Sequence, residues 1–346
     1  MKNIIYIGNS NPKTSSYQRA KALERLGNNV IIKDPYVIVE KKMKLALSNK
    51  FHYLSGYRFL QSILIDWIRE INFTEIKPDI VWVNSGELLG SKCIAILKMN
   101  HCPVILYNND DPTGGRDGGR FGSLLSAIKL YDLCVVMREV NINEFKALGA
   151  KNVLKVTMSC DEVANHPFDK AEDIPKKFHS DVAFIGTWMR HENRDEFLLD
   201  LINRGVPLSI WGDRWYKSPL WNAIKPFHRG SALSGKDYVA AIQGAKICLG
   251  LLSKGNRDLH TMRSFEIPYI GGLLCAERTV EHEKFYLEGH EAVFWNDSSE
   301  CADVCLKLLK DDKLRNDIRE AGFRRVRELG VLNEPICQKI IANCLA

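Results

Sequence analysis

The sequence ICLGLLSKGNRDLHTMRSFEIPYIGGLLCA, residues 247–276, decides the fold class. It begins with a short apolar run, passes through a polar loop into a segment of helical length, and ends after two glycines in a second apolar run. Short apolar runs separated by a helix-length segment are typical of parallel strands joined by a crossover helix. This stretch therefore predicts a strand, a loop, a helix and a second strand of one parallel sheet.

The same alternation extends over the whole 346-residue chain. Short apolar runs recur with helix-length spacers between them, and the series begins afresh after residue 180. The predicted strands are 4–8, 30–33, 79–84, 104–108, 132–137, 153–157, then 181–186, 208–212, 247–252, 273–276 and 292–295. The length and this pattern predict an α/β protein with two Rossmann-like domains in tandem.

Residues 161–180 are expected to link the two domains. They are rich in charge, contain Pro167 and Pro175, and show no apolar periodicity. We place the boundary near residue 175, which gives an N-terminal domain of residues 1–175 and a C-terminal domain of residues 176–346. The helical segment after about residue 298 could fold back onto the first domain. Ligands are expected outside the carboxyl ends of the strands, in the cleft between the domains.

The composition, 45% hydrophobic and 26% charged, is that of an ordinary globular protein. The first residues lack the features of a signal peptide and no apolar run is long enough to span a membrane, so we expect a cytoplasmic protein. Most of the ten cysteines lie in apolar runs, and Cys301 and Cys305 have no further ligand at metal-binding spacing, so no metal site is expected. The net charge of +6 is dispersed, which argues against a nucleic-acid binder.

Residues 251–266 hold the polar groups best suited to binding. Asn256 or Asp258 could cap the predicted helix, whose first amides, with Lys254 nearby, would form an anion site suited to a diphosphate. The alternative is that Asp258 is an ordinary cap with no ligand.

His260, Arg263 and Glu266 follow at spacings of three and are expected on one helical flank. A nucleotide-sugar site needs a cation facing the phosphates and a carboxylate that accepts hydrogen bonds from the ribose, and Arg263 and Glu266 fit these roles. Alternatively, the two residues form a solvated i,i+3 pair on the surface.

Motifs along most of the chain carry a family resemblance. They are NRDLHTMRSFEIP (256–268), GG (271–272), ERT (277–279), EH (281–282) and EGHEAVF (288–294), together with DDP (110–112), REVN (138–141), FIGTW (184–188) and IWG (210–212). With these motifs the sequence resembles the spore maturation protein-like (CgeB-type) glycosyltransferases, which are related to glycosyltransferase family four. The resemblance implies a GT-B fold, with two Rossmann-like domains facing each other across a cleft.

The resemblance also assigns roles in the C-terminal domain. Glu266 is similar to the second of two glutamates in family four, which contacts the donor ribose, and Asp258 stands eight residues earlier, where the family has the first. It further implies that Lys254 and Arg263 contact the diphosphate. Because Asp258 is a shorter acid, its catalytic role and the stereochemical course stay open.

Loops after other strands complete the predicted donor site. The resemblance implies that Gly186 and Thr187 border the phosphates and base, and that His228 lies near the base. His228 could instead have a structural role. In the first domain Gly8 and Asn9 end the opening strand, where a turn without side-chain bulk lets backbone amides approach a ligand. The alternative there is a turn that caps the next helix through Ser10 or Asn11.

Three acids in the first domain are candidates for the catalytic base. Asp110 and Asp111 follow a predicted strand and stand ahead of a glycine-rich loop that could close over a ligand, and Glu87 follows the neighbouring strand. A carboxylate at the cleft edge can take the proton of an attacking acceptor hydroxyl. An aspartate before proline is also common in ordinary turns.

Residues 41–60 interleave basic and aromatic or aliphatic side chains ahead of an apolar helix. Such a stretch can lie flat on anionic lipid head groups, which would suit a lipid-linked acceptor. The alternative is a core helix with a solvated flank.

The predicted function is therefore a metal-independent glycosyltransferase without a cofactor. It would transfer a sugar from a nucleoside diphosphate sugar to a glycan, lipid-linked or other hydroxyl acceptor in cell-surface polysaccharide or glycoconjugate synthesis. We expect the protein in the cytoplasm, or peripheral on the inner face of the cell membrane. The alternatives are a nucleotide-sugar epimerase or hydrolase of the same fold, or a non-catalytic binding subunit.

Overall fold

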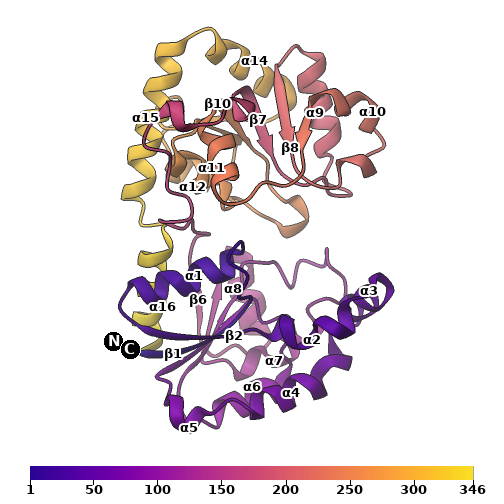
Figure 1. Cartoon of the computed structure of the whole chain (residues 1–346), viewed down its shortest axis with the longest axis vertical. Coiled ribbons are helices and arrows are strands. Elements are labelled where there is room, and N and C mark those ends of the chain that lie inside the picture. Colours follow the sequence, from indigo (N-terminus) through magenta and orange to yellow (C-terminus); the bar gives the residue numbers. More distant parts are fainter. Residues whose placement is uncertain (346) are drawn as a thin grey trace. The chain divides into compact units, whose positions relative to one another are not determined.

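The computed structural model describes residues 1–345 and contains two α/β units, each built on a six-stranded parallel sheet (Figure 1). Unit 1 comprises residues 1–157 together with the C-terminal helix, and unit 2 comprises Met158–Leu332. Within the described part of the chain, no helix has the length and apolar character needed to span a bilayer.

Unit 1 has the strand order β2-β1-β3-β4-β5-β6. Its strands are β1 (Asn3–Ile7), β2 (Asn29–Lys33), β3 (Ile80–Asn84), β4 (Val104–Tyr107), β5 (Leu133–Val136) and β6 (Val153–Lys155). Its helices are α1 (Ser15–Arg25), α2 (Pro35–Met43), α3 (Ala46–Leu54), α4 (Gln61–Arg69), α5 (Phe73–Ile76), α6 (Ser91–Lys98), α7 (Gly122–Ala127), α8 (Glu139–Ala147) and α16 (Asn333–Leu345).

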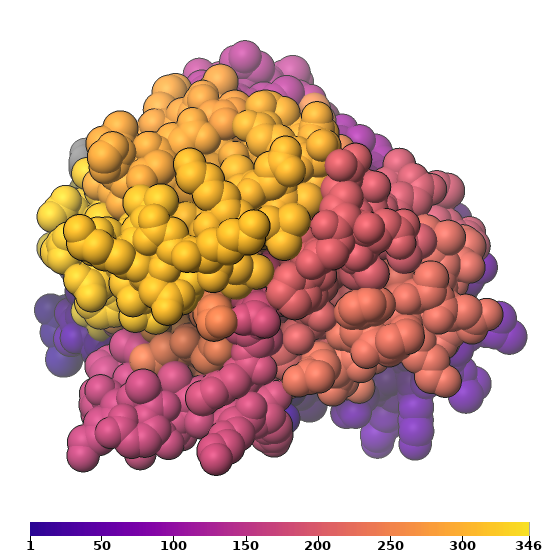
Figure 2. Space-filling view, turned by 90° about the horizontal axis from the view of Figure 1, so that it is seen from above, coloured from indigo at the N-terminus to yellow at the C-terminus, as the bar shows by residue number. Residues whose placement is uncertain are grey.

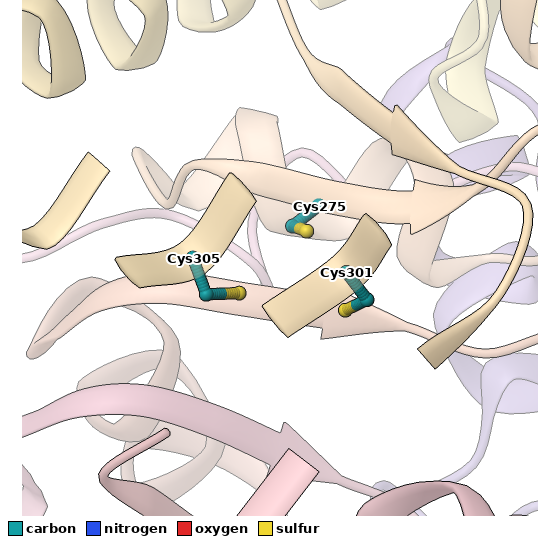
Figure 3. A group of neighbouring side chains, drawn as sticks. All are labelled: Cys275, Cys301 and Cys305. Carbon is teal, nitrogen blue, oxygen red and sulfur yellow. The ribbon is translucent and has the colours of Figure 1, made fainter. Parts of the chain in front are cut away.

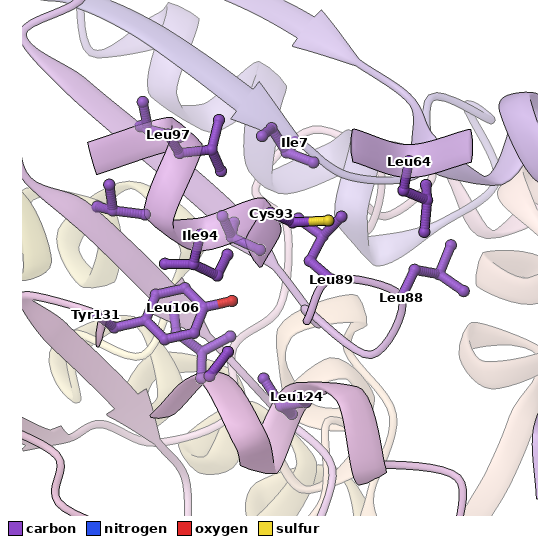
Figure 4. Packing of buried hydrophobic residues seen from close by; sticks show 14 of the residues in the cluster. Ile7, Leu64, Leu88, Leu89, Cys93, Ile94, Leu97, Leu106, Leu124 and Tyr131 are labelled. Carbon is purple, nitrogen blue, oxygen red and sulfur yellow. The ribbon is translucent and has the colours of Figure 1, made fainter. Parts of the chain in front are cut away.

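The core of unit 1 lies between the sheet and helices α4, α6 and α7. Figure 4 shows Leu64 of α4 and Ile94 and Leu97 of α6 packed near Ile7 and Leu106 of the sheet, and all five side chains are buried. Strands that are covered on both faces are expected to be continuous apolar runs, which explains why the sequence pattern located them.

Unit 2 has the strand order β12-β11-β10-β7-β8-β9. Its strands are β7 (Ser180–Ile185), β8 (Leu208–Trp211), β9 (His228–Gly230), β10 (Ala245–Gly250), β11 (Leu274–Glu277) and β12 (Val293–Trp295). Its helices are α9 (Arg194–Asn203), α10 (Trp221–Ile224), α11 (Gly235–Gln243), α12 (Arg263–Ile270), α13 (His282–Phe285), α14 (Ser298–Leu309) and α15 (Asp312–Glu328).

Every predicted strand is present, and one strand was not predicted. β9 is the three-residue segment His-Arg-Gly at the edge of the second sheet. It has no apolar run because an edge strand this short does not contribute side chains to the core.

The division of the chain differs from the predicted boundary near residue 175, because it falls between Thr157 and Met158. The segment expected to be a linker is docked on unit 2. The Phe168 amide donates to Gln243 Oε1 (2.7 Å), the Gln243 side chain donates back to the Phe168 carbonyl (2.9 Å), and Ile174 and Phe178 are buried. Figure 2 shows this magenta segment bordering the yellow helix α15, with which it lines a pocket of about 660 Å³.

Helix α16 belongs to unit 1, as the possible return of the C-terminal segment had suggested. It packs against α1, and Arg25 of α1 forms an ion pair with Glu334 of α16 (2.5 Å). The chain therefore passes between the units twice. The two passing segments run together within unit 2, where Cys160 and Leu332 form an isolated parallel bridge.

Each sheet contains a point where the strand order reverses direction, between β1 and β3 in unit 1 and between β7 and β10 in unit 2. Connections leave the sheet on opposite faces at such a switch point, which opens a crevice beyond the carboxyl ends of the strands. Gly8 and Glu87 follow the first pair of strands, whereas Gly186 and Lys254 follow the second pair. The topology thus places these four predicted site residues at the two switch points.

Candidate functional site

Helix α12 begins later than the sequence suggested. The prediction that Asn256 or Asp258 caps it is wrong, because the helix starts at Arg263 after Met262, which provides no side-chain cap. Residues 253–262 instead form a loop that contains a single 3-10 turn at Lys254–Asn256. Arg263 and Glu266 are therefore in the first turn of the helix.

Arg263 is fixed at the switch point through one end of its guanidinium group. Its Nε donates to the carbonyl of Ile185, the last residue of β7 (2.7 Å), and its Nη groups form no hydrogen bond with any residue in 1–345, although the guanidinium lies 5.8 Å from the Tyr238 ring. Burial opposes its charge, but Tyr238 and Glu266 keep the pKa of Arg263 above its ordinary value. The result is a preorganised cation with hydrogen-bond donors left for a ligand.

Glu266 lies one helical turn further on, and it is 8% exposed. Its Oε2 accepts a hydrogen bond from the Tyr238 hydroxyl of α11 (2.5 Å), which orients the carboxylate. Burial raises the pKa of Glu266, although Arg263 and the Tyr238 hydrogen bond act in the opposite direction. The second oxygen remains available to accept hydrogen bonds from hydroxyl groups.

The loop after β10 is held by a carboxylate from another loop. Glu192, at the end of the loop that follows β7, accepts hydrogen bonds from the Lys254 amide (2.8 Å), the Gly255 amide (3.3 Å) and the Ser253 hydroxyl (3.0 Å). These two amides precede Asn256, so Glu192 holds the loop ahead of the amides that were expected to face a ligand. Lys254 Nζ itself is exposed and lies 3.8 Å from Glu277, and both residues line a pocket of about 360 Å³.

His260 is buried and uses both ring nitrogens within unit 2. The Met158 amide donates to Nε2 (2.9 Å), so the proton of the neutral ring is on Nδ1, which faces Glu281 Oε2 at 2.5 Å. His260 precedes α12, so it does not share a helical flank with Arg263 and Glu266. Its observed contacts tie the loop to the start of unit 2.

The loops after β7 and β8 are packed against each other. Gly186 and Thr187 follow β7, and Arg194 at the start of α9 donates to the Thr187 carbonyl (3.0 Å) and the Leu252 carbonyl (3.3 Å). A Cβ atom at Gly212 would lie 2.0 Å from the Gly186 carbonyl oxygen, and the φ angle of Gly212 is +148°. The crossing of these two loops therefore requires glycine at position 212.

His228 lies at the next strand along the same sheet. Its Nε2 donates to the Gly212 carbonyl (3.0 Å), and its ring makes an edge contact with Trp221. His228 and Trp221, with Tyr216, line a pocket of about 460 Å³ beside Gly212. The position combines a structural hydrogen bond with an aromatic surface open to a ligand.

The turn after β1 in unit 1 is tightly packed. A Cβ atom at Gly8 would lie 2.6 Å from Ser16 Oγ, and Asn9 Oδ1 accepts from the amide of Asn11 (2.9 Å). The proposed cap at Ser10 or Asn11 is wrong, because Thr14 caps α1 by accepting from the Tyr17 amide. Asn9 lies in this turn, at the switch point of the sheet.

Glu87 and Asp110 converge on one guanidinium group, that of Arg120. Arg120 Nε donates to Glu87 (2.6 Å), one Nη lies 3.5 Å from Asp110, and the other donates to Asp117 (3.0 Å). Glu87 also accepts from the Tyr36 hydroxyl (2.9 Å) and is buried, whereas the Asp110 side chain is 26% exposed. Asp110 is therefore the more accessible of the two candidate bases.

Asp111 has a different environment from its neighbour. It is 4% exposed and accepts a hydrogen bond from the Asn141 side chain of α8 (2.8 Å). Arg138, the residue before α8, donates to the Asp110 carbonyl (2.8 Å). These contacts bind the loop to α8 and turn the Asp111 carboxylate inward.

The three cysteines Cys275, Cys301 and Cys305 meet in the core of unit 2, with all sulfur atoms within 4.8 Å of one another (Figure 3). Cys275 lies on β11 and the other two on α14, and all three are fully buried. Three thiolates in an apolar interior would need compensating charge, so we describe them as packed thiols. The absence of a metal site stays a prediction.

Three residues of these sites were not singled out from the sequence. Tyr238 and Glu192 carried no local signal, since their partners are distant along the chain. Arg120 stood at the end of the glycine-rich loop that follows Asp110, and a cation close to several acids was a signal that could have identified it.

The C-terminal half matches a known family model, and the whole chain matches solved structures. A model described as "Glycosyl transferase-like" matches residues 190–332. No curated protein matches the sequence.

The solved structures are similar in fold and distant in sequence. Sucrose-phosphate synthase from Thermosynechococcus elongatus is 10% identical with a TM-score of 0.70, covering 100% of this chain and 99% of that one. HepE from Anabaena in complex with UDP-glucose is 10% identical with a TM-score of 0.69, covering 99% of each chain. A Listeria monocytogenes protein assigned as a UDP-N-acetylglucosamine 2-epimerase is 11% identical with a TM-score of 0.53, covering 94% of each chain. The fold is GT-B, with two Rossmann-like domains.

Proposed function

We propose that the protein is a glycosyltransferase that moves a sugar from a nucleoside diphosphate sugar to a hydroxyl acceptor. The observation that carries the proposal is the pair formed by Arg263 and Glu266 at the switch point of unit 2. Arg263 is an anchored cation whose Nη groups can still donate hydrogen bonds to a ligand, and it lies one helical turn from the oriented carboxylate of Glu266. The family-model match covers both residues, and HepE in complex with UDP-glucose supports a nucleotide sugar as donor.

In this proposal the donor lies along the carboxyl edge of the unit 2 sheet. Arg263 and Lys254 face the diphosphate, and their charges stabilise it as it leaves, so that no divalent metal is required. Glu266 accepts hydrogen bonds from the ribose. The packed backbone at Gly186 and Thr187 borders the phosphates, because it offers close approach without side-chain bulk.

The remaining predicted donor residues take supporting roles. The aromatic pocket beside His228 offers stacking surfaces for the base. We assign His260 to holding the loop, because both its nitrogens are engaged, and we keep Asn256 and Asp258 as candidates for contacts with the transferred sugar. Gly8 and Asn9 remain candidates at the unit 1 switch point.

We assign the general base to Asp110. The acceptor oxygen attacks the anomeric carbon, the bond to the diphosphate breaks, and the acceptor proton passes to the carboxylate. Arg120 and Glu87 position Asp110 and limit its rotation. Asp111 supports the same loop from inside.

Acceptor dependence is the test of the reaction class. The protein is incubated with a panel of nucleotide sugars that includes UDP-glucose, with and without glycan and lipid-linked alcohol acceptors, while nucleoside diphosphate release and new sugar nucleotides are measured. Transfer predicts release that requires an acceptor. The likeness to the Listeria protein favours epimerisation as the second candidate, and a new sugar nucleotide formed without acceptor would establish it in place of transfer.

The base assignment has a matched pair of variants. Asp110→Asn should lower kcat by about 10²–10⁴-fold and leave the affinity for UDP unchanged. Asp111→Asn should mainly lower the melting temperature, because a neutral amide oxygen, a weaker acceptor, replaces the carboxylate that accepts the Asn141 hydrogen bond. If Asp110→Asn keeps the wild-type kcat, another group is the base.

A further inference from the structure

Unit 1 presents an unusual concentration of exposed apolar side chains on α2, α3 and the 3-10 turn Arg58–Leu60. Six of the sixteen exposed large hydrophobic side chains of the described chain lie here, within residues 37–59. These six, which we call the α3 surface, are Val37, Leu45, Leu47, Phe51, Leu54 and Phe59. A contiguous patch of exposed apolar side chains marks an interaction site more often than exposed apolar side chains that are scattered singly.

These side chains do not belong to the core. The core helix in this region is α4, which buries Leu64 and Ile68, whereas the one residue of α3 that is buried is His52. Leu47 is 84% exposed and Leu54 is 56% exposed, and both lie with Phe51 on one stripe of the helix. Of the two interpretations that the sequence allowed, a core helix describes α4 and an exposed amphipathic helix describes α3.

The aromatic members of the surface are ordered by contacts with one another. The rings of Phe51 and Phe59 stack with their centres 5.1 Å apart, and the Arg58 guanidinium lies 4.7 Å from the Phe59 ring. The turn and the helix therefore form one continuous apolar face. Figure 1 shows α3 at the outer edge of its unit.

Basic side chains surround this face. Five exposed cations lie in residues 41–58, and none of them forms an ion pair with any residue in 1–345. They are Lys41, Lys42, Lys44, Lys50 and Arg58. Glu40 is the one acid between residues 36 and 60.

We infer that the α3 surface docks on a lipid bilayer with anionic head groups, inserting its apolar stripe while the cations contact the lipid phosphates. Unpaired positive charge argues against a second copy of the same surface, since two copies would repel each other. An exposed apolar stripe flanked by lysines matches what an interfacial helix needs. The inference does not depend on the transferase activity, because it uses no residue of either site.

Vesicle co-sedimentation of the full chain tests the inference. Vesicles of phosphatidylcholine alone are compared with vesicles that contain 30% phosphatidylglycerol, in about 0.05 and 0.5 M salt. Binding should require the anionic lipid and weaken at high salt, because the screening length falls. Each cation near such a surface contributes about fivefold in affinity, so Lys44→Glu with Lys50→Glu should weaken binding at least tenfold.

Matched controls separate the surface from general charge and hydrophobicity. Lys310→Glu with Lys313→Glu makes the same charge change on exposed residues of unit 2 and should bind like the wild type. Leu47→Ser with Leu54→Ser should also lose at least tenfold, whereas Leu287→Ser, exposed in unit 2, should not.

Circular dichroism and melting temperature verify that every variant is folded. Equal binding to neutral and anionic vesicles, or equal losses in the controls, would overturn the inference. So would a dimer in solution that the Leu47→Ser and Leu54→Ser changes dissociate, because a second copy would then cover the face.

Discussion

Replacing Arg263 with alanine should weaken nucleoside diphosphate binding by roughly 10–150-fold. The estimate follows from the observed geometry, in which Nε is anchored to Ile185 and the Nη groups remain for a ligand. A hydrogen bond to a charged group contributes about 1.5–3 kcal/mol, and a factor of ten in affinity is about 1.4 kcal/mol. Loss of the Nε contact should cost about 1 kcal/mol of stability, or about 2–4 °C in melting temperature.

The assay is isothermal titration calorimetry with UDP, after a thermal-shift comparison of UDP, GDP, ADP and dTDP. Arg263→Lys should recover part of the loss, because it keeps the charge but not the fork or the Nε anchor. Arg204→Ala is the matched control. Arg204 follows α9, where the chain leads into the amino end of β8 and so away from the carboxyl ends of the strands, and it pairs with Asp200. A folded Arg263→Ala protein that binds within twofold of wild type would refute the reasoning, as would a wild type that binds none of the four nucleotides.

Three further predictions concern stability. Burial raises the pKa of Glu266, so the contribution of this residue to stability is full below its pKa in the unfolded chain and is lost as pH rises through its pKa in the folded protein. The melting temperature of Glu266→Gln should therefore increase relative to that of the wild type between pH 4 and 8. A constant difference in melting temperature across that range would contradict this. Burial lowers the pKa of His282 to about 4, so the wild-type free energy of unfolding should fall by roughly 3 kcal/mol as pH drops from 6.5 toward 4. For His282→Gln, the free energy of unfolding measured in urea should depend less on pH over this range. Gly212→Ala should cost roughly 3 kcal/mol or more in urea unfolding, because its Cβ would meet the Gly186 carbonyl, whereas Gly205→Ala, with positive φ but open space, should cost about 1–2 kcal/mol.

The sequence predicted the two sheets because their strands are buried on both faces. Segments such as Val104–Tyr107 are continuous apolar runs, and this signal is local. β9 was missed for the converse reason, since His228–Gly230 has no side chain that the core requires. The docked segment after Met158 was mistaken for a linker because its anchors, Phe168 and Ile174, are isolated among charged residues.

The pairing of Arg263 with Glu266 was predictable from the sequence, and the geometry around the pair was less so. Arg263 and Glu266 were identified correctly as neighbours on a helix, because a three-residue spacing determines that relation. The start of the helix was misplaced, since the chain stays a loop up to Met262, and the carboxylate that holds this loop, Glu192, comes from a different connection. A contact between residues this far apart in sequence depends on the folded topology, and no local pattern encodes it.

The placement of α16 affects how the chain can fold as it is synthesised. Domains generally fold in order from the N-terminus during translation. Here the face of α1 that α16 covers must wait until the last helix has left the ribosome, although α1 is among the first segments made. Unit 2 can therefore be complete while unit 1 still exposes part of its core, and released chains truncated after Leu332 should carry a finished second unit and an unfinished first one.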